Sequence, residues 1–260
     1  MHRVILVVAA LLFSVPALEQ GRPGRVPNKN AKAPGASIGS GEFTFVRTIY
    51  SSPFMGRRLG SWATDYPEAD YHFISGIRLW STTNLSISAQ PEQIAILDDR
   101  LFDYPLIYFV EPGYMVLSGE EARRLREYTA RGGLLFLDDF WGDYEWQNVR
   151  HQMRMIFPGR LIEDLPLAHP VFHSYFDIAE VVQVPGIGSW LGRGVTHEKG
   201  GIVPHYMGIE DEKGRLVTFI ARNCDLGDAW EWINDPRYPV KYGLAAYRLG
   251  INVIMYAMSH

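Results

Sequence analysis

Acidic and indole side chains occur together in two short stretches of the sequence. Residues 138–146 contain Asp138, Asp139, Trp141, Asp143, Glu145 and Trp146, and residues 223–232 contain Asn223, Asp225, Asp228, Trp230 and Glu231. Carboxylates accept hydrogen bonds from hydroxyl groups, and an indole ring stacks on the C–H face of a sugar. We therefore predict that these stretches bind a small polar ligand, with saccharides as one class.

The same carboxylates could also perform catalysis. Asp138, Asp139 and Glu145 are the candidates for an acid and base pair in a saccharide-acting hydrolase, which requires burial to raise the pKa of one carboxyl group. A structural alternative remains open for Asp143 and Asp228, because acidic residues are common at helix N-termini. The tryptophans would then fill the core. The sequence alone does not decide whether the protein is an enzyme.

Two histidines give a weaker indication of metal chemistry. His169 and His173 have i, i+4 spacing, and together with Asp138 and Asp139 they could form a metal-dependent hydrolase site. However, Pro170 favours a turn at this point, and no H-E-x-x-H pattern is present. We predict no resident metal and no cofactor.

Several other reaction classes lack their sequence motifs. The chain has no G-x-S-x-G elbow, no G-x-x-x-x-G-K-[ST] loop and no strand-linked G-x-G-x-x-G fingerprint. Its single cysteine, Cys224, precedes an acidic stretch that should raise the pKa of the thiol and disfavour a thiolate nucleophile.

The elements that position these residues follow from the apolar pattern. Continuous apolar runs at 106–110 and 134–137 predict strands buried on both faces. Between them, Ser118 and Glu121 form a capping box, and the helix that they open ends at Gly132–Gly133. This β-α-β unit predicts a parallel pair of strands.

The remaining segments extend this unit to an α/β domain. We predict strands at 43–47 and 181–184, helices at 70–82, 145–157 and 242–258, a Gly-rich loop at 186–201, and a hairpin of strands 206–209 and 216–220. The expected fold is a mostly parallel sheet with helices on both faces, a β-hairpin and a long C-terminal helix.

Ligands of open α/β sheets bind beyond the carboxyl ends of the strands. Arg47, Glu111, Asp138 and Asp139 follow predicted strands and should share this edge. Residues 223–232 join them only if the strand before them runs parallel to strand 134–137, which a hairpin strand need not do.

The N-terminal sequence predicts export. Residues 1–17 have the basic start, apolar run and small-residue pattern of a signal peptide, residues 18–42 form a flexible leader, and residues 43–260 form one domain. We expect a periplasmic or extracellular protein without a membrane span in the mature chain, and a cell-envelope protein is a candidate partner. The net charge of −4 gives no indication of nucleic-acid binding.

Several motifs together resemble one bacterial family. They occupy residues 43–47, 65–67, 101–105, 138–146, 157–158, 169–173, 223–232, 247–252 and 256–260. In this order they resemble the uncharacterised family named domain of unknown function 4159. The resemblance implies a flavodoxin-like sheet of the class I glutamine amidotransferase-like group, which includes the trehalose-utilisation type, and no established activity. Because residues 138–140 are Asp-Asp-Phe where amidotransferases carry a nucleophilic Cys, glutamine hydrolysis is not expected.

Overall fold

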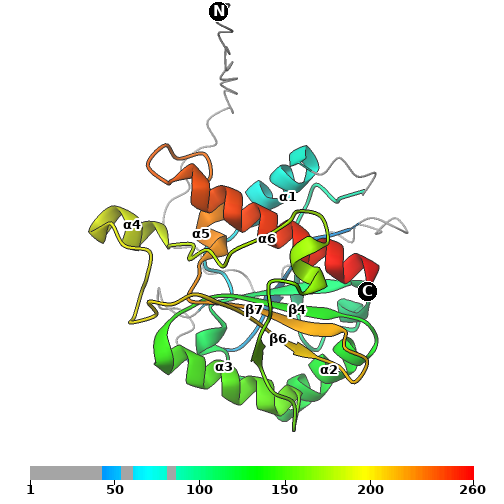
Figure 1. Ribbon diagram of the computed structural model, residues 1–260. Helices are drawn as coiled ribbons and strands as arrows, with labels where there is room; N and C mark the ends of the chain where they lie inside the picture. The colour runs from blue at the N-terminus through cyan, green and yellow to red at the C-terminus, as the bar shows by residue number, and fades with distance from the viewer. Residues whose placement is uncertain (1–42, 54–60, 81–85) are drawn as a thin grey trace, which may run out of the picture. The chain divides into compact units, whose positions relative to one another are not determined.

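A seven-stranded mixed sheet forms the centre of the domain, with the strand order β2-β1-β3-β4-β7-β6-β5. Figure 1 shows β4, β6 and β7 of this sheet between α6 on one side and α2 and α3 on the other. Strands β2, β1, β3, β4 and β7 are parallel, β6 is antiparallel to β7, and β5 is antiparallel to β6. The strands are β1 (Val46–Ile49), β2 (Glu92–Ala95), β3 (Leu106–Val110), β4 (Leu134–Phe140), β5 (Glu163–Asp164), β6 (His205–Glu210) and β7 (Leu216–Arg222). The predicted α/β class is confirmed.

The computed structural model describes residues 43–53, 61–80 and 86–260, which belong to one compact unit. The predicted signal peptide (1–17), the leader (18–42) and the end of the predicted helix at 81–82 lie outside the described residues. None of the helices in the described ranges is long and apolar enough to cross a membrane.

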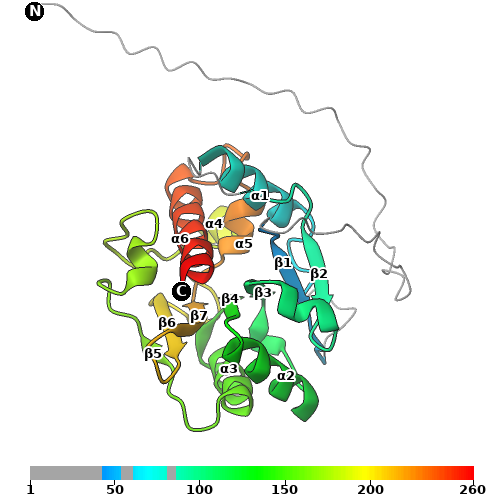
Figure 2. The same ribbon diagram turned by 90° about the vertical axis from the view of Figure 1, so that its right-hand side faces the viewer.

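Helices cover both faces of the sheet (Figure 2). On one face α1 (Glu68–Trp80), α5 (Leu226–Glu231) and α6 (Val240–Ser259) pack on Leu106, Tyr108 and other strand residues. On the other face α2 (Gly119–Ala130) and α3 (Gly142–Ile156) pack on Ile107, Phe109 and their neighbours. Successive residues of β3 therefore enter two different cores, which explains its uninterrupted apolar sequence. The shorter helices are η1 (Asp99–Asp103), η2 (Pro112–Tyr114), η3 (Pro170–His173) and α4 (Ile187–Arg193).

The β3-α2-β4 unit forms as the sequence predicts. Ser118 Oγ accepts a hydrogen bond from the Glu121 amide at 3.1 Å, and Glu121 Oε2 accepts one from the Ser118 amide at 2.7 Å. β3 and β4 then pair in parallel from Leu106↔Leu134 to Val110↔Asp138. This pairing brings Glu111, directly after β3, beside the acidic end of β4.

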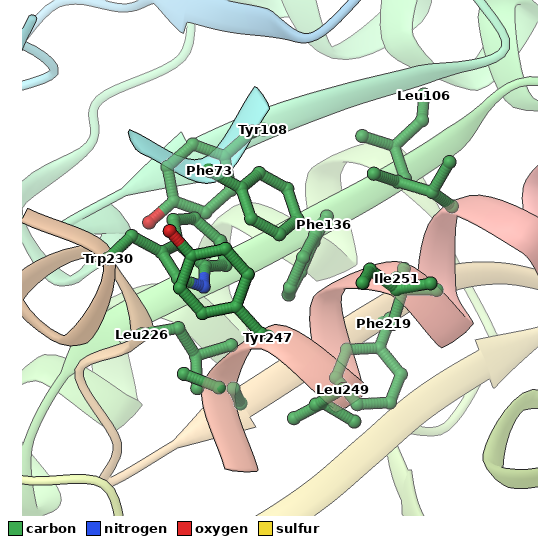
Figure 3. Packing of buried hydrophobic residues seen from close by; sticks show 14 of the residues in the cluster. Phe73, Leu106, Tyr108, Phe136, Phe219, Leu226, Trp230, Tyr247, Leu249 and Ile251 are labelled. Atoms are coloured by element: carbon green, nitrogen blue, oxygen red, sulfur yellow. The ribbon is translucent and has the colours of Figure 1, made fainter. Parts of the chain in front are cut away.

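Aromatic side chains form the centre of the core on the α6 face (Figure 3). The Trp230 ring stacks on Phe73 with 4.0 Å between the ring centroids, and Tyr108, Phe136 and Tyr247 surround this pair. Trp230 has no exposed surface. The short helix α5 is therefore anchored in the core by its tryptophan, and this anchor fixes the position of the acids on the same helix.

Several boundaries differ from those predicted. The predicted strand at 181–184 is wrong, because the Tyr206 hydroxyl bonds the backbone of Val182 and the Asp225 amide donates to the Val184 carbonyl in place of a neighbouring strand. β1 lies at 46–49 rather than 43–47, β2 was not predicted, and α4 lies inside the predicted loop. The hairpin and the final helix match the predicted ranges within two residues.

Candidate functional site

The two acid-rich stretches meet at one edge of the sheet. β7 runs parallel to β4, so residues 223–232 emerge at the same edge as residues 138–146, a point that the sequence left open. The Asn223 amide donates to the Phe140 carbonyl at 3.0 Å directly after the two strands. The edge formed by the carboxyl ends of the parallel strands therefore carries both stretches.

Unusual backbone geometry is concentrated at this edge. Five residues other than glycine in the described ranges have positive φ: Asp65 (60°), Glu111 (46°), Asp139 (55°), Lys199 (44°) and Asn223 (58°). Each such conformation costs about 1–3 kcal/mol and persists only where the surroundings impose it. Glu111, Asp139 and Asn223 stand at the ends of β3, β4 and β7, where the chain leaves the sheet.

Arg47 and Glu111 hold the segment that precedes α1. The Arg47 guanidinium is fully buried, pairs with Asp70, and donates to the Thr64 carbonyl at 2.7 Å. Glu111 Oε2 accepts hydrogen bonds from the Ser61 amide at 2.9 Å and the Thr64 hydroxyl at 2.8 Å. Burial opposes the charge of Arg47, but the contact with Asp70 keeps its pKa above the ordinary value.

These contacts place Asp65 at the edge, next to the start of α5. A Cβ atom added to Gly227 would lie 2.5 Å from Asp65 Oδ2, so glycine is required there for the close approach. Asp65 is therefore brought to the acidic stretches by Arg47 and Glu111, which act on the segment before it.

Asp138 and Asp225 hold the N-terminus of α5. Asp138 Oδ2 accepts hydrogen bonds from the Tyr108 hydroxyl and from the amides of Leu226 and Gly227, at 2.9–3.1 Å. Burial raises the pKa of Asp138 to about 7, although these hydrogen bonds act in the opposite direction. Asp225 is the N-cap residue and accepts from the Asp228 amide at 2.8 Å. Asp228 lies in the first turn of α5, as the structural alternative expected, but the N-cap hydrogen bond is made by Asp225.

Asn223 and Glu145 hold the start of α3. Asn223 Oδ1 accepts from the Gly142 amide at 2.9 Å, and its Nδ2 donates to the Val203 carbonyl at 2.6 Å. Glu145 accepts from the Trp141 amide and from Lys199 Nζ, both at 2.6 Å. Burial disfavours the Lys199 charge, but the Glu145 carboxylate outweighs this effect and raises the pKa of Lys199.

Five carboxyl groups lie together at this edge in two overlapping groups, and we call them the carboxyl cluster: Asp65, Asp139, Asp225, Asp228 and Glu231. Oxygens of Asp65, Asp139 and Asp225 lie within 4.8 Å of one another, and so do oxygens of Asp65, Asp228 and Glu231. Burial, followed by the neighbouring carboxyl groups, raises the pKa values of Asp65, Asp139 and Asp225 well above the ordinary range. The same two causes raise the pKa of Glu231 to about 7.

A family model matches residues 44–258, nearly the whole described domain. The chain belongs to the family Domain of unknown function (DUF4159). A search among curated proteins gives no match. The long acidic and tryptophan-containing motifs on which the resemblance was based thus lie inside the matched range, and in this DUF4159 domain they build the edge described above.

Trp141 and Trp230 of this DUF4159 domain do not border the carboxyl cluster with exposed faces. Trp141 and Trp230 are buried, and Trp141 Nε1 donates to Asp139 Oδ1 at 3.0 Å. Trp146 stacks on Phe140 under the Arg222 guanidinium. The Asp143 side chain is 89 % exposed and pairs with Arg222 at 3.1 Å. Asp143 and Trp146 thus gather around Arg222 instead of joining the carboxyl cluster.

The two histidines lie at the opposite edge of the sheet. His169 Nε2 is 3.2 Å from Glu210 Oε1, and Glu210 pairs with Leu216 at the start of β7. The six steps from there to Arg222 place this contact roughly 20 Å from the carboxyl cluster, at about 3.3 Å per residue. His173 contacts Asp177 and the Leu167 carbonyl. The structure therefore does not bring His169 and His173 together with Asp138 and Asp139.

Sequence reasoning missed Asp65 and Lys199 as site residues. Asp65 appeared only within the motif 65–67 that resembles the family, and no pattern marks Lys199, which lies in the loop between α4 and β6. Cys224 is fully buried, its Sγ donates to the Val182 carbonyl at 3.6 Å, and burial raises the pKa of the thiol. These surroundings disfavour a thiolate at Cys224.

Proposed function

We propose that this DUF4159 domain binds a polar, positively charged ligand through the carboxyl cluster. The observation that carries the proposal is the concentration of strained backbone there: the five positive-φ residues other than glycine in the described ranges all belong to this edge. Proteins retain such strain mainly where function requires a particular geometry. Asp65 and Asp139 carry two of the five strained conformations and both belong to the carboxyl cluster.

The electrostatics of the edge support a cationic ligand. The basic groups that the described part of the chain brings to this edge already have acidic partners, because Arg47 pairs with Asp70, Lys199 with Glu145 and Arg222 with Asp143. Three states are then possible for the carboxyl cluster: some of its carboxyl groups stay protonated, the ionised carboxylates repel one another, or a positively charged ligand binds between them. A cationic ligand removes the repulsion and benefits from the low effective dielectric of the buried oxygens.

The alternative of a saccharide-acting hydrolase has less support. Stacking on a sugar requires an exposed ring face, and the rings of Trp141 and Trp230 are buried. The metal-dependent hydrolase with histidine ligands has less support as well, because His169 lies at the other edge of the sheet.

Thermal denaturation with added compounds tests the proposed function. CaCl2, MgCl2, spermidine and glucose are each added to the protein after treatment with a chelator. We expect at least one of the positively charged compounds to raise the Tm and glucose to have no effect. A ligand at a hundredfold excess over its Kd contributes about 2.7 kcal/mol to stability.

The informative variant is Asp139→Asn, because asparagine tolerates the positive φ and can still accept from Trp141 Nε1. It should fold, and it should lose most of the stabilisation by the ligand. Asp99→Asn is the matched control, since the Asp99 side chain is 99 % exposed and precedes β3 at the opposite edge. If no compound raises the Tm, or if Asp139→Asn responds like wild type, the proposed function is wrong.

Two further proposals rest on the sequence and topology. The parallel strands follow the order β2-β1-β3-β4-β7, which corresponds to the 2-1-3-4-5 order of flavodoxin-like sheets and supports membership of the class I glutamine amidotransferase-like group. Export to the periplasm or the exterior rests on residues 1–17. Mass spectrometry of the purified protein from a periplasmic fraction, with cleavage near Ala17 as the expected result, tests the second proposal.

A further inference from the structure

We propose that Asp65, Asp139 and Asp225 together bind one divalent cation that prefers oxygen ligands, such as Ca²⁺, Mg²⁺ or Mn²⁺. This inference rests on the proposed function and names the class of its ligand. Each of the three residues offers one carboxylate oxygen within 4.8 Å of the other two. Oxygen ligands of these ions lie at about 2.0–2.6 Å, so two oxygens on one ion can be up to about 5 Å apart, and the spacing of the three oxygens falls within this limit.

Unpartnered oxygens provide a second observation at the same place. Asp65 Oδ2 and Asp138 Oδ1 are buried and have no hydrogen-bond partner among the described residues. The Asp138 side chain is completely buried, and its other oxygen binds the Leu226 and Gly227 amides, next to the point where Asp65 approaches Gly227. An unsatisfied buried carboxylate oxygen is costly, and a bound cation with its water ligands would satisfy it.

The chemistry of the donors selects the class of ion. All members of the two close groups are carboxylates, without histidine or cysteine. Carboxylate sets suit Mg²⁺, Ca²⁺ and Mn²⁺, whereas thiolate and imidazole ligands favour Zn²⁺ and Cu²⁺. The nearest thiol, Cys224, is fully buried and donates to the Val182 carbonyl.

Of the two groups, Asp65, Asp139 and Asp225 form the better candidate for the cation site. In the second group, Asp228 Oδ2 already accepts the Ile187 amide at 2.6 Å. Asp139 and Asp225 are both more than nine-tenths buried, and they come from β4 and the N-cap of α5, two rigid elements of the core. Asp65 is the third ligand residue, and it comes from the segment before α1 that Arg47 and Glu111 hold in place. The cation thus joins three segments that are far apart in the sequence.

Isothermal titration of chelator-treated protein with CaCl2, MgCl2 and MnCl2 tests the assignment. We expect one binding event per chain for at least one of these salts, and a change in tryptophan fluorescence because Trp141 Nε1 bonds Asp139. Asp225→Asn should weaken binding at least tenfold while asparagine keeps the N-cap hydrogen bond. Gly227→Ala should also weaken it, because the added Cβ displaces Asp65 Oδ2. The Asp99→Asn variant should bind like wild type.

The outcomes separate this inference from the proposed function. Stabilisation by spermidine without binding of any of the three metal salts would overturn the cation site and leave the proposed function standing. Unchanged metal affinity in both Asp225→Asn and Gly227→Ala, with folding verified by circular dichroism, would also overturn it. An absence of response to every compound, spermidine included, would contradict both.

Discussion

Two segments of similar sequence, one in the first turns of α3 and one in α5, have different electrostatic surroundings at the same edge of the sheet. Residues 142–146 are Gly-Asp-Tyr-Glu-Trp, and residues 227–232 are Gly-Asp-Ala-Trp-Glu-Trp. In the first segment both acids have basic partners, Asp143 with Arg222 at 3.1 Å and Glu145 with Lys199 at 2.6 Å. In the second, neither Asp228 nor Glu231 forms a salt bridge within the described residues, and both lie close to Asp65.

The difference comes from parts of the chain outside both segments. Lys199 and Arg222 reach the first segment from the residues before β6 and from the end of β7, while Asp65 reaches the second segment from the residues before α1. The acids of the same short motif therefore have basic partners in one place and further carboxyl groups as neighbours in the other. What each acid can do depends on its neighbours in space, and the motif alone does not specify them.

The largest expected contrast concerns the tryptophans. Trp230→Ala should lower the free energy of unfolding by about 3–5 kcal/mol, because it removes a fully buried ring stacked on Phe73. Trp146→Ala should cost about 1 kcal/mol, since that ring is only partly buried between Phe140 and Arg222. Urea denaturation measures both. Equal losses would contradict the assignment of Trp230 to the core.

The two glutamates should respond in opposite directions. Glu145→Gln should destabilise the protein by about 2 kcal/mol, because it removes the charge that pairs with Lys199, whose side chain is 36 % exposed. Glu231→Gln should raise the Tm of the chelator-treated protein, because it relieves repulsion with Asp228.

Thermal denaturation of both variants, with a double-mutant cycle of Glu145→Gln and Lys199→Gln, measures these effects. A coupling energy near zero between Glu145 and Lys199 would contradict the ion-pair explanation. A lower Tm in Glu231→Gln would show that Glu231 stabilises α5, and the two glutamates would then not differ in the direction of their effect.

Local sequence signals were sufficient for the β3-α2-β4 unit. The apolar runs of β3 and β4 and the capping box at Ser118 depend on neighbours within a few residues, and these elements appear as predicted. The strand predicted at 181–184 has suitable residues, but its backbone groups bond Tyr206 and Asp225, which sequence propensity does not report. β-Strand propensity therefore predicts a strand correctly only where a partner strand is available.

The site was predictable in part. The rule for the carboxyl ends of parallel strands placed Asp138 and Asp139 at the correct edge. The sequence does contain a pattern that indicates the burial of Trp230. Leu226, Ala229 and Trp230 have i, i+3, i+4 spacing, which marks the apolar face of a helix. The position of Asp65 had no local signal, since it depends on Arg47 and Glu111, which are 18 and 46 residues away in the numbering of the chain.

The smallest expected effect is the pH dependence of stability in chelator-treated protein. The pKa of Glu231 is raised from 4.5 to about 7 by burial and Asp228, and that of Asp138 from 3.8 to about 7 by burial. From about pH 4 to pH 7 the unfolded chain loses these protons while the folded protein keeps them. Stability should therefore fall as the pH rises through this window, and it should be highest near its lower end.

Lys199, the partner of Glu145, should not contribute to this slope. The pKa of Lys199 is raised above its ordinary 10.5, so Lys199 keeps its proton throughout the window. The lowered pKa values of Asp98, Asp211 and Asp235 affect stability only near and below pH 4. Urea midpoints at pH 4.5, 6 and 7.5 should fall for wild type and fall less for Glu231→Gln. An identical slope in the variant would mean that Glu231 ionises in the folded protein as readily as in the unfolded chain, which would contradict the electrostatic difference between the two segments.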